Sequence, residues 1–111
     1  MVEWNAKVVQ MNEKPRFRLR FVSRSVVEVT PKMAEAWLRN NPHNRPLNEE
    51  KVAALASKMR SGEWEERIRG SRTVEVLDSG RLLNGQHRLS AVVRVGVAVR
   101  MCVTVYKKIK E

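Results

Sequence analysis

The segment Leu82-Leu83-Asn84-Gly85-Gln86-His87-Arg88-Leu89 decides the fold that we predict for this chain. It is typical of a strand that ends at a glycine and turns directly into a helix. Glycine lets the backbone approach a ligand closely, and the start of a helix offers N–H groups and a dipole that favour an anion. Arg88 would add a charged, planar group suited to phosphate or carboxylate. The segment therefore predicts an anion-binding turn; a turn that only ends a strand is the alternative.

The residues around this segment predict a strand pair before it and a helix and strand after it. Residues 73–77 and 81–83 form a predicted hairpin around the turn Asp78-Ser79-Gly80. The helix is expected from about Gln86 to Val95, with Gly96 as its C-terminal stop. A valine-rich strand is expected over residues 97–106.

The first half of the chain predicts a strand and two helices. Residues 16–22 alternate arginines with apolar side chains, which indicates a half-buried strand, and residues 26–29 form a second strand or an extension of it. Thr30 and the proline after it begin one helix, and Asn48 caps another that stops at Gly62. This order predicts an α+β domain, a small mixed sheet with three packed helices.

The length of 111 residues is enough for one compact domain, which we place over residues 1–111 with a loose N-terminal arm (1–15) and a basic tail (107–111). No apolar run approaches the roughly 20 residues that span a bilayer, and no signal peptide is recognisable. The single cysteine, Cys102, cannot form an internal disulfide. We expect a cytoplasmic protein without a membrane partner.

The net charge is the second strong feature. Twenty-two Lys and Arg residues outweigh twelve Asp and Glu residues, which gives +10 at neutral pH. Such an excess is typical of a nucleic-acid binder, with DNA favoured here, although many basic proteins are simply well solvated. Strand geometry would space alternate side chains about 6.6 Å apart, similar to phosphates along one strand. The residues predicted to contact nucleic acid are Arg16, Arg18, Arg20, Lys107, Lys108 and Lys110.

Two motifs occur together in this chain. The first is Asn41-Pro42-x-x-Arg45-Pro46-Leu47, followed by a helix with Lys51-Val52-x-x-Leu55-Ala56; the second is Gly85-Gln86-His87-Arg88-Leu89-x-Ala91. Together they resemble the ParB/sulfiredoxin superfamily. The chain is most similar to the small ParB-like "nuclease domain" proteins of bacteria and phages, which carry an (Asn/Asp)-Gly-Gln-His-Arg-Leu motif. The resemblance covers about residues 26–105.

The resemblance implies a ParB/sulfiredoxin-like fold with a nucleotide or phosphate site at the glycine turn. It implies phosphate contacts from Arg45, Asn84, Gly85, Gln86, His87 and Arg88. A nucleoside triphosphate with magnesium is the cofactor that it suggests, and the absence of any cofactor is the alternative. The oligomeric state is left open, and a homodimer is compatible with the sequence.

Activity follows less directly than fold. The turn of the sulfiredoxins carries a catalytic cysteine where this chain has Gln86, and residues 39–44 hold no carboxylate that could assist phosphoryl transfer. We therefore expect binding with little or no catalysis, and whether the chain is an enzyme is left open. The alternatives are a magnesium-dependent nuclease or phosphotransferase of the same superfamily, and a phage factor that binds a host protein. The histidines and the cysteine lie too far apart in sequence to predict a metal site.

Overall fold

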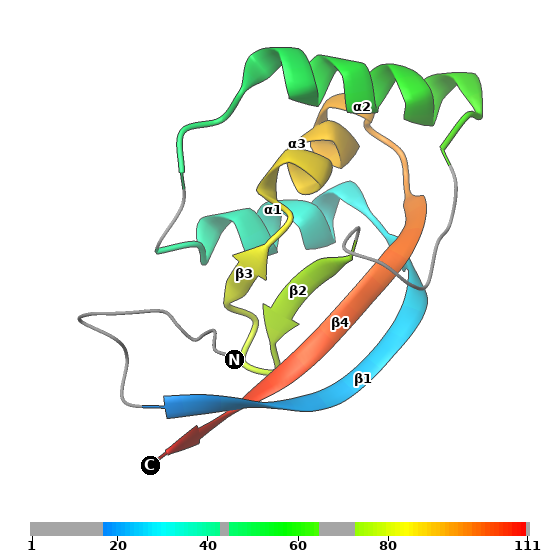
Figure 1. Cartoon of the computed structure of the whole chain (residues 1–111). Helices are drawn as coiled ribbons and strands as arrows, with labels where there is room; N and C mark the ends of the chain where they lie inside the picture. The colour runs from blue at the N-terminus through cyan, green and yellow to red at the C-terminus, as the bar shows by residue number, and fades with distance from the viewer. Residues whose placement is uncertain (1–16, 43–44, 65–72, 111) are drawn as a thin grey trace, which may run out of the picture.

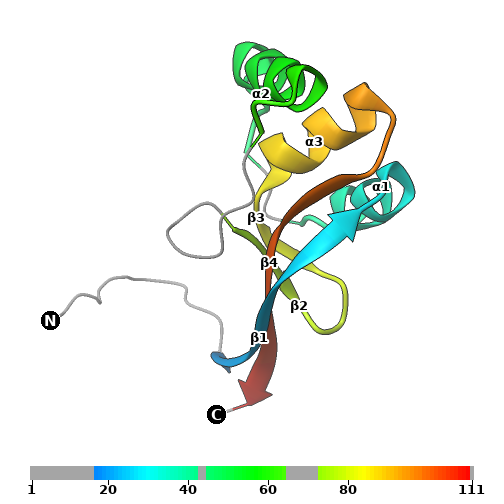
Figure 2. The same cartoon turned by 90° about the vertical axis from the view of Figure 1, so that its right-hand side faces the viewer.

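The computed structural model describes residues 17–42, 45–64 and 73–110, which form a four-stranded mixed sheet with three helices. The strand order is β1-β4-β2-β3, and the three helices lie on one side of the sheet (Figures 1 and 2). The elements in chain order are β1 (Phe17–Val29), α1 (Pro31–Arg39), α2 (Glu49–Ser61), β2 (Val74–Leu77), β3 (Leu82–Asn84), α3 (Gln86–Val95) and β4 (Val99–Lys110). The expected α+β class with a small mixed sheet is confirmed.

The centre of the sheet is β4, which pairs antiparallel with β1 and parallel with β2. The β2–β3 hairpin completes the sheet, as the sequence predicts, and Gly80 in its turn has a φ of 97°. Side chains from every strand meet α1 and α3 in one apolar core, in which Val29, Val74, Leu89 and Met101 are almost completely buried. This burial is the main stabilising contribution to a domain of this size.

The helix boundaries follow the local signals in the sequence. The Thr30 side chain accepts a hydrogen bond from the Met33 amide, and the Asn48 side chain accepts one from Lys51. Gly62 and Gly96 end α2 and α3 in the left-handed conformation, with φ near 84° and 83°. These residues satisfy backbone groups that a helix end leaves without partners, so they fix where each helix begins and ends. The predicted helix ends are confirmed.

Helix α2 is attached to the domain mainly through α3. α3 lies between α1 and α2 (Figure 2), and a small second core of Val52, Ala56 and Ala91 joins α2 to α3. An ion pair between Arg94 and Glu49 (2.6 Å) supports this contact at the surface. α2 thus stands away from the sheet and leaves space beneath it. No helix in the described ranges is long and apolar enough to cross a membrane.

Two expectations about the outer strands are wrong. β1 is one strand with a register shift between Phe21 and Ser23, and the part predicted to be half-buried is exposed: Leu19 is 44% exposed and Phe21 56%. β4 continues through Lys110, so residues 107–110 belong to the sheet and not to a tail. Both differences have one cause: the two strands pair with each other beyond the part of the sheet that the helices cover. The expected arm, residues 1–15, lies outside the described residues.

Candidate anion-binding cleft

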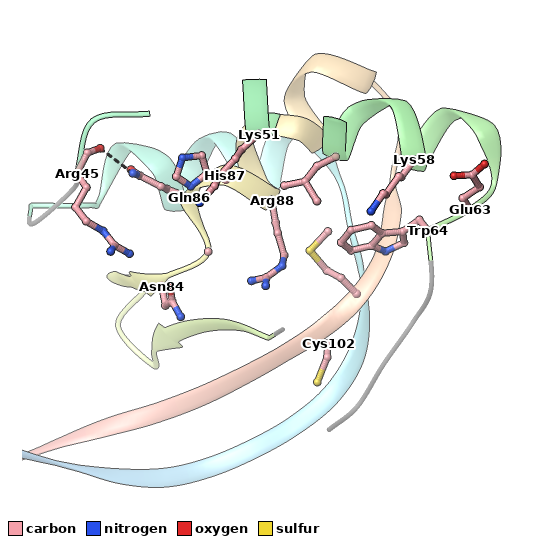
Figure 3. A pocket seen from close by; sticks show the side chains of 13 residues that line it. Arg45, Lys51, Lys58, Glu63, Trp64, Asn84, Gln86, His87, Arg88 and Cys102 are labelled. Atoms are coloured by element: carbon pink, nitrogen blue, oxygen red, sulfur yellow. Dashed lines mark hydrogen bonds between the residues drawn. The ribbon is translucent and has the colours of Figure 1, made fainter. Parts of the chain in front are cut away.

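The glycine turn opens into a cleft of about 670 Å³ between α2 and the strands. Four cationic side chains and one carboxylate line it in the described structure: Arg45, Lys51, Lys58, Arg88 and Glu63. Figure 3 shows Arg45, Arg88 and Lys58 projecting toward the strands, with Asn84 near Arg45. The volume of the cleft lies within the range typical of small-ligand sites, roughly 300–1,000 Å³. The excess of positive charge suits an anionic ligand.

Gly85 is required by the backbone itself. It precedes α3 with a φ of 114°, and a Cβ atom here would lie 3.0 Å from Cγ2 and 3.2 Å from Cα of Val74. The glycine therefore lets the β3–α3 turn pack against β2, which is sufficient reason for it without any ligand. The result is that α3 begins at the floor of the cleft with no side-chain cap and no acidic residue in its first turn.

The Gln86 side chain holds the loop that carries Arg45. Its Nε2 donates a hydrogen bond to the carbonyl oxygen of Arg45 (2.7 Å), and its Oε1 accepts one from Nδ2 of Asn41 (3.1 Å). Gln86 is only 8% exposed, and both ends of its amide are bonded. The Gln86 side chain thus positions Arg45. Gln86 also lines the cleft, because it is the first residue of α3.

His87 joins the starts of two helices. The backbone N–H of Asn48, which caps α2, donates a hydrogen bond to Nε2 of His87 (3.0 Å). Partial burial lowers the pKa of His87 below its usual 6.5, and the positive charges of Lys51, Arg45 and Arg88 lower it further. An imidazole that accepts at Nε2 carries its proton on Nδ1, so His87 is neutral at pH 7.

Arg88 connects α3 to the start of β2 and also lines the cleft. Its guanidinium donates to the carbonyl oxygen of the buried Thr73 (3.2 Å). Arg88 therefore has a structural bond, and the ligand contact that the sequence predicts for it stays a prediction.

The structure brings together one of the two predicted groups. Arg45, Asn84, Gly85, Gln86, His87 and Arg88 all line the same cleft. The second group, predicted to contact nucleic acid, lies elsewhere, on β1 and β4: Arg18, Arg20, Lys107 and Lys108. Arg16 lies outside the described residues, and the side chain of Lys110 is not described.

Two lysines of the cleft are absent from the sequence prediction. Lys51 and Lys58 both reach it from α2, with Leu55 between them. They are seven residues apart, which is two helical turns, so this spacing could have placed them on one face. Trp64 also lines the cleft; it is half-buried, and its Nε1–H donates to the carbonyl oxygen of Arg100 (2.7 Å).

Within the described ranges, no group of three or more His, Cys, Asp or Glu residues is placed to hold a metal ion.

Comparisons of the chain with protein-family models, with curated proteins and with solved structures found no match.

Proposed function

We propose that this protein is a phosphate-binding module whose cleft holds the phosphates of a nucleotide or of a nucleic acid. The observation that carries the proposal is the grouping of Arg45, Lys51 and Arg88 around the uncapped start of α3, with Lys58 further along the same cleft. A helix start favours an anion, whereas three cations around it repel one another and the positive end of the dipole. A bound phosphate would relieve both effects.

The neutral state of His87 supports the same proposal. The cationic neighbours that lower its pKa indicate that the potential at the start of α3 is positive. An anion bound there would offset those charges, so binding is expected to raise the pKa of His87. The resemblance to the ParB/sulfiredoxin superfamily points to phosphate at this turn, and the four-residue segment from Gly85 to Arg88 agrees with it.

The proposed module holds phosphate and does not transform it. Among the described residues that line the cleft, Glu63 is the one carboxylate, and Figure 3 shows it beside Lys58 and Trp64, at the end far from Arg45. We expect no hydrolysis of nucleoside triphosphates and no plasmid nicking with magnesium. Turnover that disappears in Arg88→Gln, while circular dichroism shows an unchanged fold, would establish the enzymatic alternative.

Equilibrium titration at low salt tests the binding proposal, with labelled ATP and CTP, inorganic pyrophosphate and a DNA duplex as separate ligands. Losing one charged hydrogen bond costs about 1.5–3 kcal/mol, so Arg45→Gln is expected to weaken binding by about 10- to 100-fold. Lys58→Gln should weaken it to a smaller degree, because a lysine makes a less directional contact. The ligand that the wild type binds, and that these variants bind more weakly, identifies the source of the phosphate.

Arg60→Gln is the matched control, because Arg60 is exposed on the same helix as Lys58 and does not line the cleft. It removes the same charge from the molecule, so it should change the affinity by less than about twofold at moderate salt, where exposed charges are screened. Equal losses in Lys58→Gln and Arg60→Gln would mean that only the overall charge attracts the ligand, and the cleft would not be the site.

A further inference from the structure

The outer part of β1 and β4 forms a two-stranded ribbon that extends past the rest of the sheet. The last pairing of β2 with β4 is Leu77 with Tyr106, whereas β1 and β4 remain paired from Arg20 and Lys107 to Phe17 and Lys110. Figure 1 shows the two strands running beyond β2 and β3. We refer to residues 17–25 and 103–110 as the ribbon, which comprises this extension and the adjoining part of the two strands, where β4 also pairs with β2.

One face of the ribbon carries exposed apolar and aromatic side chains. Side chains alternate along a strand, and directly opposite residues share a face. Because Met101 and Val103 face the helices, Tyr106 and its partner Phe21 lie on the other face. Their rings pack edge to face, with centroids 6.3 Å apart and planes at 81°. Phe21 is 56% exposed and Leu19, on the same face, is 44% exposed.

The ribbon is also strongly basic. Its sequence contains six Lys and Arg residues and no Asp or Glu: Arg18, Arg20, Arg24, Lys107, Lys108 and Lys110. Arg20 lies directly opposite Lys107, an arrangement of like charges that destabilises a strand pair. Asp78 in the hairpin turn shares a surface hollow with Lys107 and Lys108, but Arg81 lines the same hollow, so cations outnumber the carboxylate there. The remaining excess favours a polyanion as the partner.

We propose that the ribbon binds single-stranded nucleic acid, with an unpaired base stacked on Phe21 and phosphates held by the cations around it. An exposed aromatic ring among cations suits unpaired bases, because every base has a π-face and stacking contributes about 1–3 kcal/mol per base. Arg24 and Lys108 flank the aromatic pair on its own face, and Arg20 and Lys107 lie on the reverse face. This inference goes beyond the cleft and does not depend on it.

Two other occupants fit the ribbon less well. A second copy of this chain could cover the exposed apolar side chains, but it would bring two ribbons of six cations each together. A DNA duplex matches the charge, but its bases are stacked within the helix and offer edges, so the exposed ring of Phe21 would have no face to stack on. Single strands satisfy both the charge and the exposed ring.

Fluorescence anisotropy with labelled single strands of about 15 nucleotides, in DNA and RNA forms, tests the proposal. The comparison ligands are a duplex of the same sequence and sodium polyphosphate, which has charge but no bases. We expect at least one single strand to bind more tightly than either. Phe21→Leu keeps an apolar side chain and removes the ring, so it should weaken single-strand binding by about 5- to 100-fold and leave polyphosphate binding unchanged.

The double variant Arg20→Gln/Lys107→Gln should weaken the binding of the single strands, the duplex and polyphosphate alike. For single strands, the slope of log affinity against log salt concentration should fall in magnitude by about 1.4, or 0.7 per lost contact. Lys32→Gln/Arg60→Gln removes two exposed helix charges and is the control. Arg45→Gln, in the cleft, should leave single-strand binding within about twofold, which separates this site from the proposed function. Three results would overturn the proposal. They are tighter binding of the duplex than of the single strands, unchanged single-strand affinity in folded Phe21→Leu, and a molecular mass of that variant on sedimentation that differs from the mass of the wild type.

Discussion

At the scale of single residues, His87 links protonation to the contact between α2 and α3. Its pKa is lowered below 6.5 by partial burial and by neighbouring cations, and its Nε2 accepts from the Asn48 amide. Below pH 6.5 the unfolded chain binds the proton more strongly than the folded chain. The contribution of His87 to stability is therefore complete above pH 6.5 and is lost as the pH falls through the lowered pKa.

Urea unfolding at about one pH unit above and one below 6.5 measures this linkage. The wild type should lose more unfolding free energy between the two pH values than His87→Gln, in which position 87 does not titrate. Other ionisable groups contribute equally to both proteins and cancel in the comparison. The same loss in both would show that His87 does not couple protonation to stability.

Gly85 is the residue at which the turn is most sensitive to substitution. Gly85→Ala would combine a positive φ, which costs about 1–3 kcal/mol for other residues, with a contact of 3.0 Å to Val74. We expect thermal unfolding to show a loss of at least that size. Gly62→Ala, where the added Cβ meets no atom within 4 Å, should lose less and serves as the control. A Gly85→Ala protein as stable as Gly62→Ala would contradict the described packing.

At the scale of elements, the position of α2 depends on small side chains. Ala56 and Ala91 are completely buried where α2 meets α3, and α2 supplies the roof of the cleft. Ala91→Leu should separate the helices and lower the free energy of unfolding by about 1–3 kcal/mol. Since Lys51 and Lys58 move with α2, phosphate affinity should fall as well. Ala53→Leu, exposed on the same helix, should affect neither property.

The sequence predicts elements well where the signal is local. Thr30, Asn48 and Gly62 each act within a few residues of the backbone that they satisfy, so the predicted helix ends are confirmed. The bonds of Gln86 to Asn41 and Arg45 span 45 and 41 residues, and no local pattern encodes them. The same holds for β1 and β4, whose extension depends on a pairing between the two ends of the chain.

At the scale of the whole molecule, cationic side chains gather in two of the described regions. One group of cations surrounds the cleft at the start of α3, and the other lies on the ribbon, at the far end of β4 from α2 (Figure 1). The sequence predicted part of each group but not their positions relative to each other, because which strands neighbour each other is a property of the sheet. Two separate basic surfaces would let the proposed phosphate in the cleft and the proposed single strand on the ribbon bind independently.

The central claim is that the start of α3 holds phosphate. A titration of the isotopically labelled protein with pyrophosphate, followed by two-dimensional amide NMR, tests it most directly. The account predicts the largest shifts at the amides of residues 85–88, together with a rise in the pKa of His87, and reduced shifts in Arg45→Gln. Shifts confined to other regions, with the pKa of His87 unchanged, would contradict it.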